Sequence, residues 1–542
     1  MSASKFYKDY ALKTNDKSKY LEDYNQHVAI VALYLADGNK EQAKQFILAM
    51  IEQRYQPATP TFLNAGRARR GELVSCFLLE VDDSLNSINF IDSTAKQLSK
   101  IGGGVAINLS KLRARGEAIK GIKGVAKGVL PVAKALEGGF SYADQLGQRP
   151  GAGAVYLNIF HYDVEEFLDT KKVNADEDLR LSTISTGLIV PSKFFDLAKE
   201  GKDFYMFAPH TVKQEYGVTL DDIDIEKYYD ELVANPNVLK KKKDAREMLN
   251  MIAQTQLQSG YPYLMFKDNA NKVHANSNIG QIKMSNLCTE IFQLQETSII
   301  NDYGIEDEIK RDISCNLGSL NIVNVMETGK FRDSVHTGMD ALTVVSDEAN
   351  IQNAPGVKKA NNELHSVGLG VMNLHGYLAK NKIGYESEEA KDFANIFFMM
   401  MNYYSIERSM EIAKERGEAY QDFDKSDYAS GKYFDFYTSQ EFVPQFEKVK
   451  ELFANMQIPT SEDWKSLQQQ VQEYGLYHAY RLAIAPTQSI SYVQNATSSV
   501  MPIVDQIERR TYGNAETFYP MPFLSPETMW YYKSCLLYTS PS

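Results

Sequence analysis

Apolar residues recur at three- and four-residue spacing in the first part of the chain. This spacing predicts helices over residues 20–36 and 40–54, because such positions share one face of a helix. Turn residues at 37–39 separate the two. The clearest helical pattern covers residues 388–416 and is followed by Gly417, a residue type common just after a helix. We therefore expect residues 1–56 to form a helical segment.

After this segment, short apolar runs alternate with longer helical patterns. The runs are residues 75–81, 104–109, 154–160, 185–190 and 261–266. Short, almost continuously apolar runs are typical of strands that are buried on both faces. The pattern predicts an α/β architecture with much parallel sheet, and the chain contains no internal repeat.

Composition describes an ordinary globular protein. The 542 residues are 44% apolar and 24% charged, which suffices for a large core and more than one domain. The net charge of −12 argues against a broad nucleic-acid-binding surface, although a local pocket for a phosphorylated ligand remains compatible with it. The N-terminus is polar, and the longest apolar run, 396–401, is too short to span a bilayer. We expect neither nucleic acid nor membrane as a partner.

Cysteine is scarce and widely spaced. The four cysteines are Cys76, Cys288, Cys315 and Cys535, with no CxxC pair and no disulfide framework. This usage is typical of a reducing compartment, so we expect a cytoplasmic protein. The eight histidines are scattered, and we predict no protein-bound metal.

One cysteine has an amide and a carboxylate two residues to either side: Asn286, Cys288 and Glu290. In an extended segment these three would share a face, while Leu287 and Thr289 would point away. The polar, irregular stretch before them favours a loop or extended finger over a helix. For any one cysteine alone, the simpler interpretation is a small, buried apolar residue. The Asn-x-Cys-x-Glu spacing weakens that interpretation for Cys288.

A neighbouring carboxylate makes Cys288 a poor thiolate nucleophile. The negative charge of Glu290 raises the pKa of a nearby thiol, and no histidine is adjacent in sequence to act as its base. The arrangement argues against cysteine-protease chemistry. It is compatible with chemistry that uses the sulfur as a radical and the carboxylate as a base.

Hydroxyl side chains crowd residues 485–502, after a short predicted strand at 481–485. Hydroxyls and backbone N–H groups at a strand-to-helix turn can hold an anion without lysine. A polar surface loop is the alternative interpretation. The glycine run at 101–105 does not form a phosphate-binding P-loop and is compatible with a tight turn.

Taken together, six segments resemble one family, the catalytic subunit of ribonucleotide reductase, with details similar to its aerobic bacterial class Ib. They are PATPTFLNAGRARRGELVSCFLLEVDDS (57–84), GGGVAINLSKLR (102–113), GQRPGAGAVYLNIF (147–160), MSNLCTEI (284–291), DISCNLGSLNI (312–322) and APTQSISYVQNAT (485–497). The resemblance covers residues 6–534. It implies a ten-stranded α/β barrel over residues 57–534 with a central finger loop that carries Cys288.

The resemblance also implies an activity, the reduction of ribonucleoside diphosphates to 2′-deoxy products for DNA synthesis. Cys288 would become a transient thiyl radical that removes the 3′-hydrogen, and Glu290 would take the 3′-hydroxyl proton. Asn286 would orient the sugar. Cys76 and Cys315 would form the dithiol that supplies two electrons and ends as a disulfide.

Substrate and effector residues follow from the same resemblance. The substrate pocket would comprise Thr59, Ser75, Gly104, Leu287, Thr289, Pro486, Thr487, Gln488, Ser489 and Ile490, with the diphosphate on 486–490. A deoxynucleoside triphosphate or ATP would act as allosteric effector at a dimer interface through Asp83, Arg113, Gln148 and Arg149. For Arg113 alone, a solvated surface arginine is the simpler interpretation.

Implied partners are a radical-generating beta subunit of the dimetal–tyrosyl type and a glutaredoxin-like or thioredoxin reductant. The chain would be a homodimer without a covalently bound cofactor. We expect it to be truncated at both ends relative to the family. Residues 535–542 resemble a translated sequencing adapter, so we expect them to be a non-native tail, and we expect the chain as given to be inactive.

Three other interpretations remain open. A cobalamin-dependent class II reductase shares the barrel and the Asn-x-Cys-x-Glu finger, and would need no radical subunit. A glycyl-radical enzyme is disfavoured by the dithiol pair. A non-catalytic nucleotide-binding relative would bind effector without depending on Cys288.

Overall fold

The computed structural model describes residues 2–68, 71–74, 76–143, 151–349, 351–503, 507–512 and 515–520. The chain divides into two compact units. Unit 1 comprises Met1–Val74, Asn316–Ala349 and Leu364–Ser542, and unit 2 comprises Ser75–Cys315 and Asn350–Glu363. The chain thus passes from unit 2 to unit 1 directly after Cys315.

Unit 1 begins with three helices: α1 (Ser2–Asp9), α2 (Tyr24–Leu35) and α3 (Lys40–Ile51). The two predicted helices are confirmed, but α2 begins later than its apolar pattern. Asp23 caps it: the Asp23 side chain accepts the Gln26 N–H, and the Gln26 side chain accepts the Asp23 N–H. Such a reciprocal cap satisfies backbone donors that a helix start leaves unpaired, so it fixes the boundary.

Unit 2 is built on a six-stranded sheet of order β8-β5-β4-β3-β2-β9. Its strands are β2 (Cys76–Glu80), β3 (Gly104–Asn108), β4 (Ala152–Asn158), β5 (Ser185–Val190), β8 (Tyr263–Phe266) and β9 (Ile313–Ser314). The first five run parallel, and β9 pairs antiparallel with β2. Each predicted apolar run therefore forms a parallel strand, as expected.

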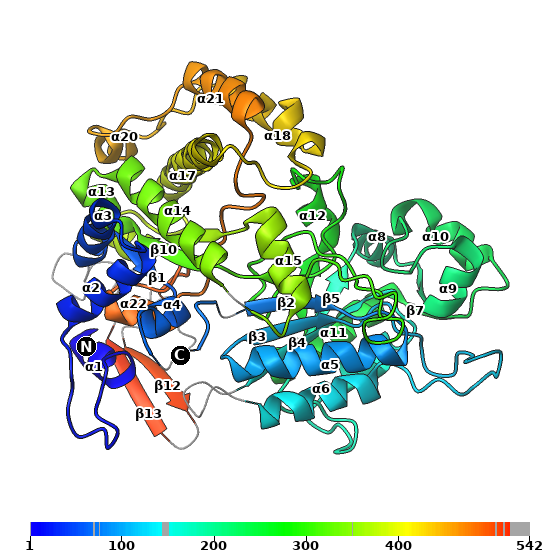
Figure 1. The fold of residues 1–542 in the computed structure, drawn as a ribbon. Coiled ribbons are helices and arrows are strands. Elements are labelled where there is room, and N and C mark those ends of the chain that lie inside the picture. The colour runs from blue at the N-terminus through cyan, green and yellow to red at the C-terminus, as the bar shows by residue number, and fades with distance from the viewer. Residues whose placement is uncertain are drawn as a thin grey trace, which may run out of the picture. The chain divides into compact units, whose positions relative to one another are not determined.

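Helices pack against this sheet. Helices α5 (Leu85–Lys100) and α6 (Leu130–Tyr142) contact each other and strands β3 and β4 (Figure 1). Every residue of β3 and of β5 is buried, because helices and loops cover both faces of a sheet of this kind. The other elements of unit 2 are α7 (Val164–Asp169), α8 (Ser192–Glu200), β6 (Asp203–Phe207), α9 (Pro209–Tyr216), α10 (Ile225–Ala234), β7 (Lys240–Asp244), α11 (Ala245–Ser259), α12 (Lys267–Lys272) and most of α15 (Pro355–Leu364).

Unit 1 contains a three-stranded sheet of order β1-β10-β11. Strand β10 (Leu317–Asn321) runs antiparallel to β1 (Tyr55–Pro57) and parallel to β11 (Gly368–Met372). The strand predicted at 481–485 is wrong in extent, since only a single parallel bridge joins Leu482 to Leu369.

Helix α17 (Glu388–Arg416) confirms the clearest helical prediction. It ends at Gly417, whose φ of +67° closes the helix with a left-handed residue. The other elements of unit 1 are α4 (Thr59–Asn64), α13 (Ile322–Thr328), α14 (Phe331–Glu348), α16 (Leu374–Lys380), η1 (Phe423–Lys425), α18 (Asp427–Ser430), η2 (Lys432–Phe434), α19 (Asp435–Thr438), α20 (Glu447–Phe453), α21 (Ser461–Tyr474), α22 (Gln488–Val493), β12 (Ile507–Tyr512) and β13 (Ala515–Pro520).

The expected closed, ten-stranded barrel is not confirmed. Over the described ranges, the strands form sheets of six, three, two and two strands, and none of these sheets closes on itself. The described residues therefore form a mixed helix-and-sheet architecture, with a largely parallel sheet in unit 2. No helix in the described part of the chain is both long and apolar enough to cross a membrane.

Candidate active site

The segment around Cys288 is a tight loop, and hydrogen bonds within the loop hold its two ends together. The Thr289 N–H donates to the Asn286 carbonyl at 3.1 Å, and Thr289 has a φ of +62°. The Ser285 hydroxyl donates to the Ile291 carbonyl between these ends at 2.8 Å. The prediction of a loop rather than a helix is confirmed, but the extended geometry is wrong, because a turn with a left-handed residue replaces the alternation of faces.

Asn286 organises this loop. It is fully buried, and its Oδ1 accepts the backbone N–H groups of Glu290 at 3.0 Å and Ile291 at 3.1 Å. Cys288 at the tip is exposed, while Glu290 is half-buried. The turn thus presents the thiol and keeps the amide beneath it.

Two buried polar atoms of this loop lack a partner within the described residues: Nδ2 of Asn286 and Oε2 of Glu290. Buried polar groups are nearly always hydrogen-bonded, so one donor and one acceptor left open in the same loop point to a polar ligand. Burial raises the pKa of the Glu290 carboxyl, and the Asn286 side chain opposes this rise. A carboxylate with a raised pKa is a stronger base than an ordinary one, which suits a proton acceptor.

Cys76 and Cys315 lie on neighbouring strands of the unit 2 sheet. Cys76 is the first residue of β2, and Cys315 directly follows β9. The Cys315 N–H donates to the Cys76 carbonyl at 2.9 Å, and both side chains are thiols. Burial raises the pKa of the Cys315 thiol well above its usual range, and the adjacent Cys76 thiol adds to this effect.

Electrostatics connect this pair to the loop. Glu290, and Cys288 in its ionised form, also raise the pKa of Cys315, so the loop and the cysteine pair lie near one another in unit 2. The structure therefore places Asn286, Cys288 and Glu290 in one loop near Cys76 and Cys315, while the catalytic role of these residues stays a prediction. The separation in sequence gives no local signal that Cys76 and Cys315 meet, which the antiparallel pairing of β2 with β9 produces.

Tyr156 supports the loop and was missed by the sequence analysis, which treated residues 154–160 only as a strand. Its hydroxyl donates to the Asn286 carbonyl at 2.8 Å and lies 3.2 Å from Oγ1 of Thr289. The ring lies over Gly187, its register partner on β5, where an added Cβ would come within 2.4 Å of it. A side chain at 187 would therefore displace the tyrosine that carries the loop.

A cluster of charged side chains holds the start of the same loop. Lys283 lies 2.5 Å from Asp222 and 3.8 Å from Glu80, whose side chain is fully buried. Lys111 lies 3.1 Å from Glu80 and 3.5 Å from Asp222. Burial alone would lower the pKa of Lys283, but Glu80 and Asp222 outweigh it and raise the pKa. This cluster fixes the chain five residues before Cys288.

The expected phosphate-binding segment lies in unit 1. Thr487 and Gln488 have φ values of +58° and +25°, strained for residues with a side chain, and the Thr487 hydroxyl accepts the Ser499 N–H at 2.9 Å. Ser489 lies in the first turn of α22, with Pro486 before the strained pair and Ile490 buried behind it.

Thr59, the first residue of α4, also lies in unit 1. Tyr10, missed by the sequence analysis, bridges it to Ser489: its hydroxyl lies 3.0 Å from Oγ1 of Thr59 and 2.6 Å from Oγ of Ser489. Gly104 belongs to unit 2, where it is the register partner of Cys76. Ser75 lies outside the described residues.

Of the four expected effector residues, two are described. The Arg113 guanidinium donates to Asp83 Oδ2 at 2.9 Å, and the Arg113 backbone N–H donates to Oδ1 at 3.1 Å. Arg113 is therefore paired rather than a solvated surface residue. Gln148 and Arg149 lie outside the described residues, as do Cys535 and the rest of the segment 535–542.

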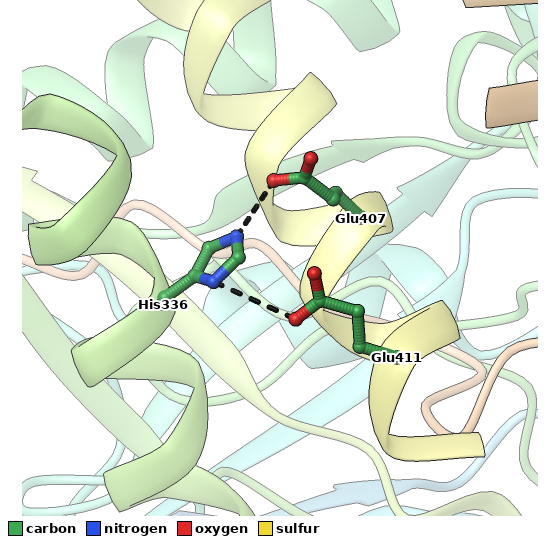
Figure 2. Close-up of side chains that lie close together, drawn as sticks. All are labelled: His336, Glu407 and Glu411. Atoms are coloured by element: carbon green, nitrogen blue, oxygen red, sulfur yellow. Dashed lines mark hydrogen bonds and ion pairs between the residues drawn. The ribbon is translucent and has the colours of Figure 1, made fainter. Parts of the chain in front are cut away.

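Another cluster brings three common metal ligands together: His336 of α14 with Glu407 and Glu411 of α17. Figure 2 shows the imidazole between the carboxylates, with Nε2 2.8 Å from Glu407 and Nδ1 3.7 Å from Glu411. The carboxylates face opposite nitrogens, and Arg332 donates to both. This geometry is that of an ion-pair network joining two helices, since a metal needs ligand atoms that converge on one point. The absence of a protein-bound metal stays a prediction.

Comparison with known proteins gives consistent matches along nearly all of the chain. A family model described as "Ribonucleotide reductase, all-alpha domain" matches residues 1–70, and one described as "Ribonucleotide reductase, barrel domain" matches residues 74–533. The ribonucleoside-diphosphate reductase subunit alpha of Bacillus subtilis is 58% identical, over 98% of this chain and 76% of its own length. The subunit of the same name from Mycoplasma pneumoniae is 45% identical, over 98% and 74%. The NrdEB subunit alpha of Bacillus subtilis is 34% identical, over 98% and 85%.

Proposed function

Since the chain belongs to the ribonucleotide reductase large-subunit family, we propose that it reduces ribonucleoside diphosphates to 2′-deoxyribonucleoside diphosphates by a thiyl-radical mechanism. The observation that carries the proposal is the meeting of Cys288, Glu290 and Asn286 with the Cys76–Cys315 pair in one unit. This is the set of groups that removal of a hydroxyl by radical chemistry requires.

The roles follow from the chemistry of each group. Cys288 as a thiyl radical takes the 3′-hydrogen atom of the ribose, and Glu290 accepts the 3′-hydroxyl proton. A thiol of the Cys76–Cys315 pair protonates the 2′-hydroxyl, which leaves as water. The pair then gives a hydrogen atom to C2′ and one further electron to the 3′-carbonyl, and becomes a disulfide. Glu290 returns its proton to O3′, and the Cys288 thiol returns a hydrogen atom to C3′, which regenerates the Cys288 radical. The raised pKa of Cys315 suits this role, because a thiol that keeps its proton can donate it.

Asn286 is the orienting residue. Its Oδ1 is occupied by backbone N–H groups, whereas its Nδ2 is open to a ligand. A sugar hydroxyl that accepts from Nδ2 and donates to Glu290 Oε2 would satisfy both open atoms at once. Leu287 and Thr289 complete the loop around this position.

The diphosphate is assigned to Thr59 and Pro486–Ile490 in unit 1, with Ser75 and Gly104 as further substrate residues. Hydroxyl and N–H donors at a strained turn fit a ligand that only accepts hydrogen bonds. The effector, a deoxynucleoside triphosphate or ATP, is assigned to Asp83, Arg113, Gln148 and Arg149. The Asp83–Arg113 pair supports this assignment, because an arginine held in place is ready to meet a phosphate.

The finer features implied by the family are part of the same proposal. They are the ten-stranded barrel, a homodimer, a cytoplasmic location, a radical from a dimetal–tyrosyl beta subunit and a glutaredoxin-like or thioredoxin reductant. The high identity to a Bacillus subtilis alpha subunit supports them.

The test is formation of 2′-deoxyribonucleoside diphosphate by the chain as its source DNA encodes it, with a radical-supplying subunit and a dithiol reductant. Product that disappears in Cys288→Ser, while substrate still binds, is the expected result. Product that depends on adenosylcobalamin instead of the subunit would favour the class II alternative. Nucleotide binding without product under either condition would favour a non-catalytic relative.

A further inference from the structure

Tyr10 connects the two hydroxyls to which the substrate diphosphate is assigned. Its hydroxyl contacts Thr59 at 3.0 Å and Ser489 at 2.6 Å, although Ser489 is 479 positions away along the chain. Tyr10 directly follows α1, which contacts α22, and all of these elements belong to unit 1. The side chain is only 3% exposed, so the contact is inside the protein.

The capacity of these hydroxyls to bind a phosphate depends on which of them donates in each hydrogen bond. Each hydroxyl has one hydrogen to donate and two lone pairs to accept with. A phosphate oxygen only accepts, so it needs hydroxyls whose hydrogens are not already used inside the protein. Where Tyr10 donates to Thr59 or Ser489, the hydroxyl that accepts is left with its own hydrogen for another partner.

Tyr10 can act as the donor in one of these two contacts. Burial raises the pKa of the Tyr10 phenol, although Ser489 and Thr59 lower it in part, so the phenol keeps its proton at neutral pH. The ring packs against Phe62 of α4 with centroids 5.3 Å apart, which holds the hydroxyl at its place. The Thr487 hydroxyl also acts as an acceptor, because its Oγ1 accepts the Ser499 N–H. Its own hydrogen is therefore available to donate to a phosphate oxygen.

We propose that Tyr10 is a positioning residue of the substrate diphosphate site, which donates to one of the Thr59 and Ser489 hydroxyls and so leaves the hydrogen of that hydroxyl free to point at a phosphate. This inference rests on the proposed function, which assigns the diphosphate to Thr59 and residues 486–490. It makes the N-terminal helical segment part of the substrate site.

The experiment measures equilibrium binding of CDP and of cytidine to the full chain and to Tyr10→Phe. Phenylalanine keeps the ring and its packing on Phe62 and removes only the hydroxyl. Loss of one oriented hydrogen bond predicts roughly three- to tenfold weaker binding of CDP. Binding of cytidine, which lacks phosphate, should be unchanged. Tyr7→Phe is the matched control, because Tyr7 lies in α1 and no hydrogen bond is recorded for its hydroxyl in the described part of the chain.

The variants Thr59→Ala and Ser489→Ala separate the role of Tyr10 from the existence of the phosphate site itself. If Tyr10 acts through these hydroxyls, Tyr10→Phe combined with one of them weakens CDP binding less than the sum of the single effects. Normal CDP binding by Tyr10→Phe beside weak binding by Thr59→Ala would overturn the role of Tyr10 and leave the site in place. Equal weakening for CDP and cytidine would also overturn it, as a general packing effect. Normal CDP binding by all three single variants would overturn the assigned phosphate site itself, and the inference with it.

Discussion

The backbone N–H of Cys315 donates a 2.9 Å hydrogen bond to the carbonyl of Cys76. The antiparallel register of β2 and β9 pairs Phe77 with Ser314, so Cys76 and Cys315 are the next pair along the same ladder. Directly opposed residues of antiparallel strands have Cα atoms about 4.5–5.5 Å apart. That spacing lies within the range that a disulfide spans.

We therefore expect mild oxidation to join Cys76 to Cys315 without rearranging the sheet. Peptide mapping after oxidation and alkylation should find this pair cross-linked and Cys288 alkylated, since Cys288 is exposed at the loop tip. Cys315→Ser should abolish the cross-link. A dominant disulfide to Cys288 would contradict the assignment of the pair.

Glu290→Gln should change stability in a pH-dependent way. Burial raises the pKa of Glu290, opposed by Asn286, so the folded protein binds this proton more tightly than the unfolded chain. The bound proton therefore adds to the free energy of unfolding below the unfolded-state pKa of about 4.3. This contribution is lost as pH rises through the folded-state pKa. Glutamine resembles the protonated form, so the variant should gain stability relative to the parent as pH rises through this window.

The measurement is the midpoint of thermal unfolding for both proteins between acidic and neutral pH. The exposed Glu177, changed to Gln, is the control and should show no such trend. A variant whose unfolding midpoint equals that of the parent in acid and lies below it at neutral pH would contradict this prediction. We also expect Glu290→Gln to lose activity, because it removes the proposed base.

Gly187→Ala should displace the Cys288 loop by shifting Tyr156, which supports it. The added Cβ would lie 2.4 Å from the Tyr156 ring, so the ring and its 2.8 Å bond to the Asn286 carbonyl must shift. Misplacement of a reacting group by about 1 Å can cost roughly a hundredfold in rate, so we expect a loss of about ten- to a hundredfold in deoxynucleotide formation. Tyr156→Phe, which only removes the hydrogen bond, should be milder.

Gly138→Ala is the matched control for this glycine. Gly138 lies in α6, where an added Cβ meets nothing within 4 Å. Alanine in a helix is also more favourable than glycine. Equal losses of activity in the two variants would argue that Gly187 does not act through Tyr156.

Lys283→Met should destabilise the protein through the charges that it leaves behind. Glu80 is fully buried and Asp222 partly buried, and both lose a cation. Breaking a buried ion pair costs several kcal/mol, and because Asp222 is partly exposed and Lys111 remains near Glu80 we expect about 2–3 kcal/mol less free energy of unfolding. Urea unfolding measures this loss. The exposed Lys272 changed to Met should stay within about 0.5 kcal/mol, and the same small effect for Lys283→Met would refute the role of the cluster.

Local pattern was enough to predict much of the fold. Helical spacing predicted α2, α3 and α17, and the stop at Gly417 was visible because a left-handed closing residue has a sequence preference of its own. Continuous apolar runs predicted the five parallel strands of unit 2, since burial on both faces requires them. The start of α2 was misjudged because the Asp23 cap stops a helix that apolar spacing would extend.

The catalytic candidates were likewise visible in the sequence as residue types, through the Asn-x-Cys-x-Glu spacing and two further cysteines. Their chemistry followed from the family that the chain resembles. The shape of the loop did not follow, because Asn286 bonds its own downstream backbone, and such local side-chain bonds compete with the extended form.

Only the tertiary structure could decide which distant residues serve these groups. Tyr10 reaches Ser489 across 479 positions, and Tyr156 reaches Asn286 across 130. In the sequence both tyrosines are ordinary apolar positions of a helix end and a strand. Their partners are set by helix packing and strand register, which depend on the whole chain and leave no local periodicity to read. The sequence by itself determined the reacting groups, and the fold decided what holds and orients them.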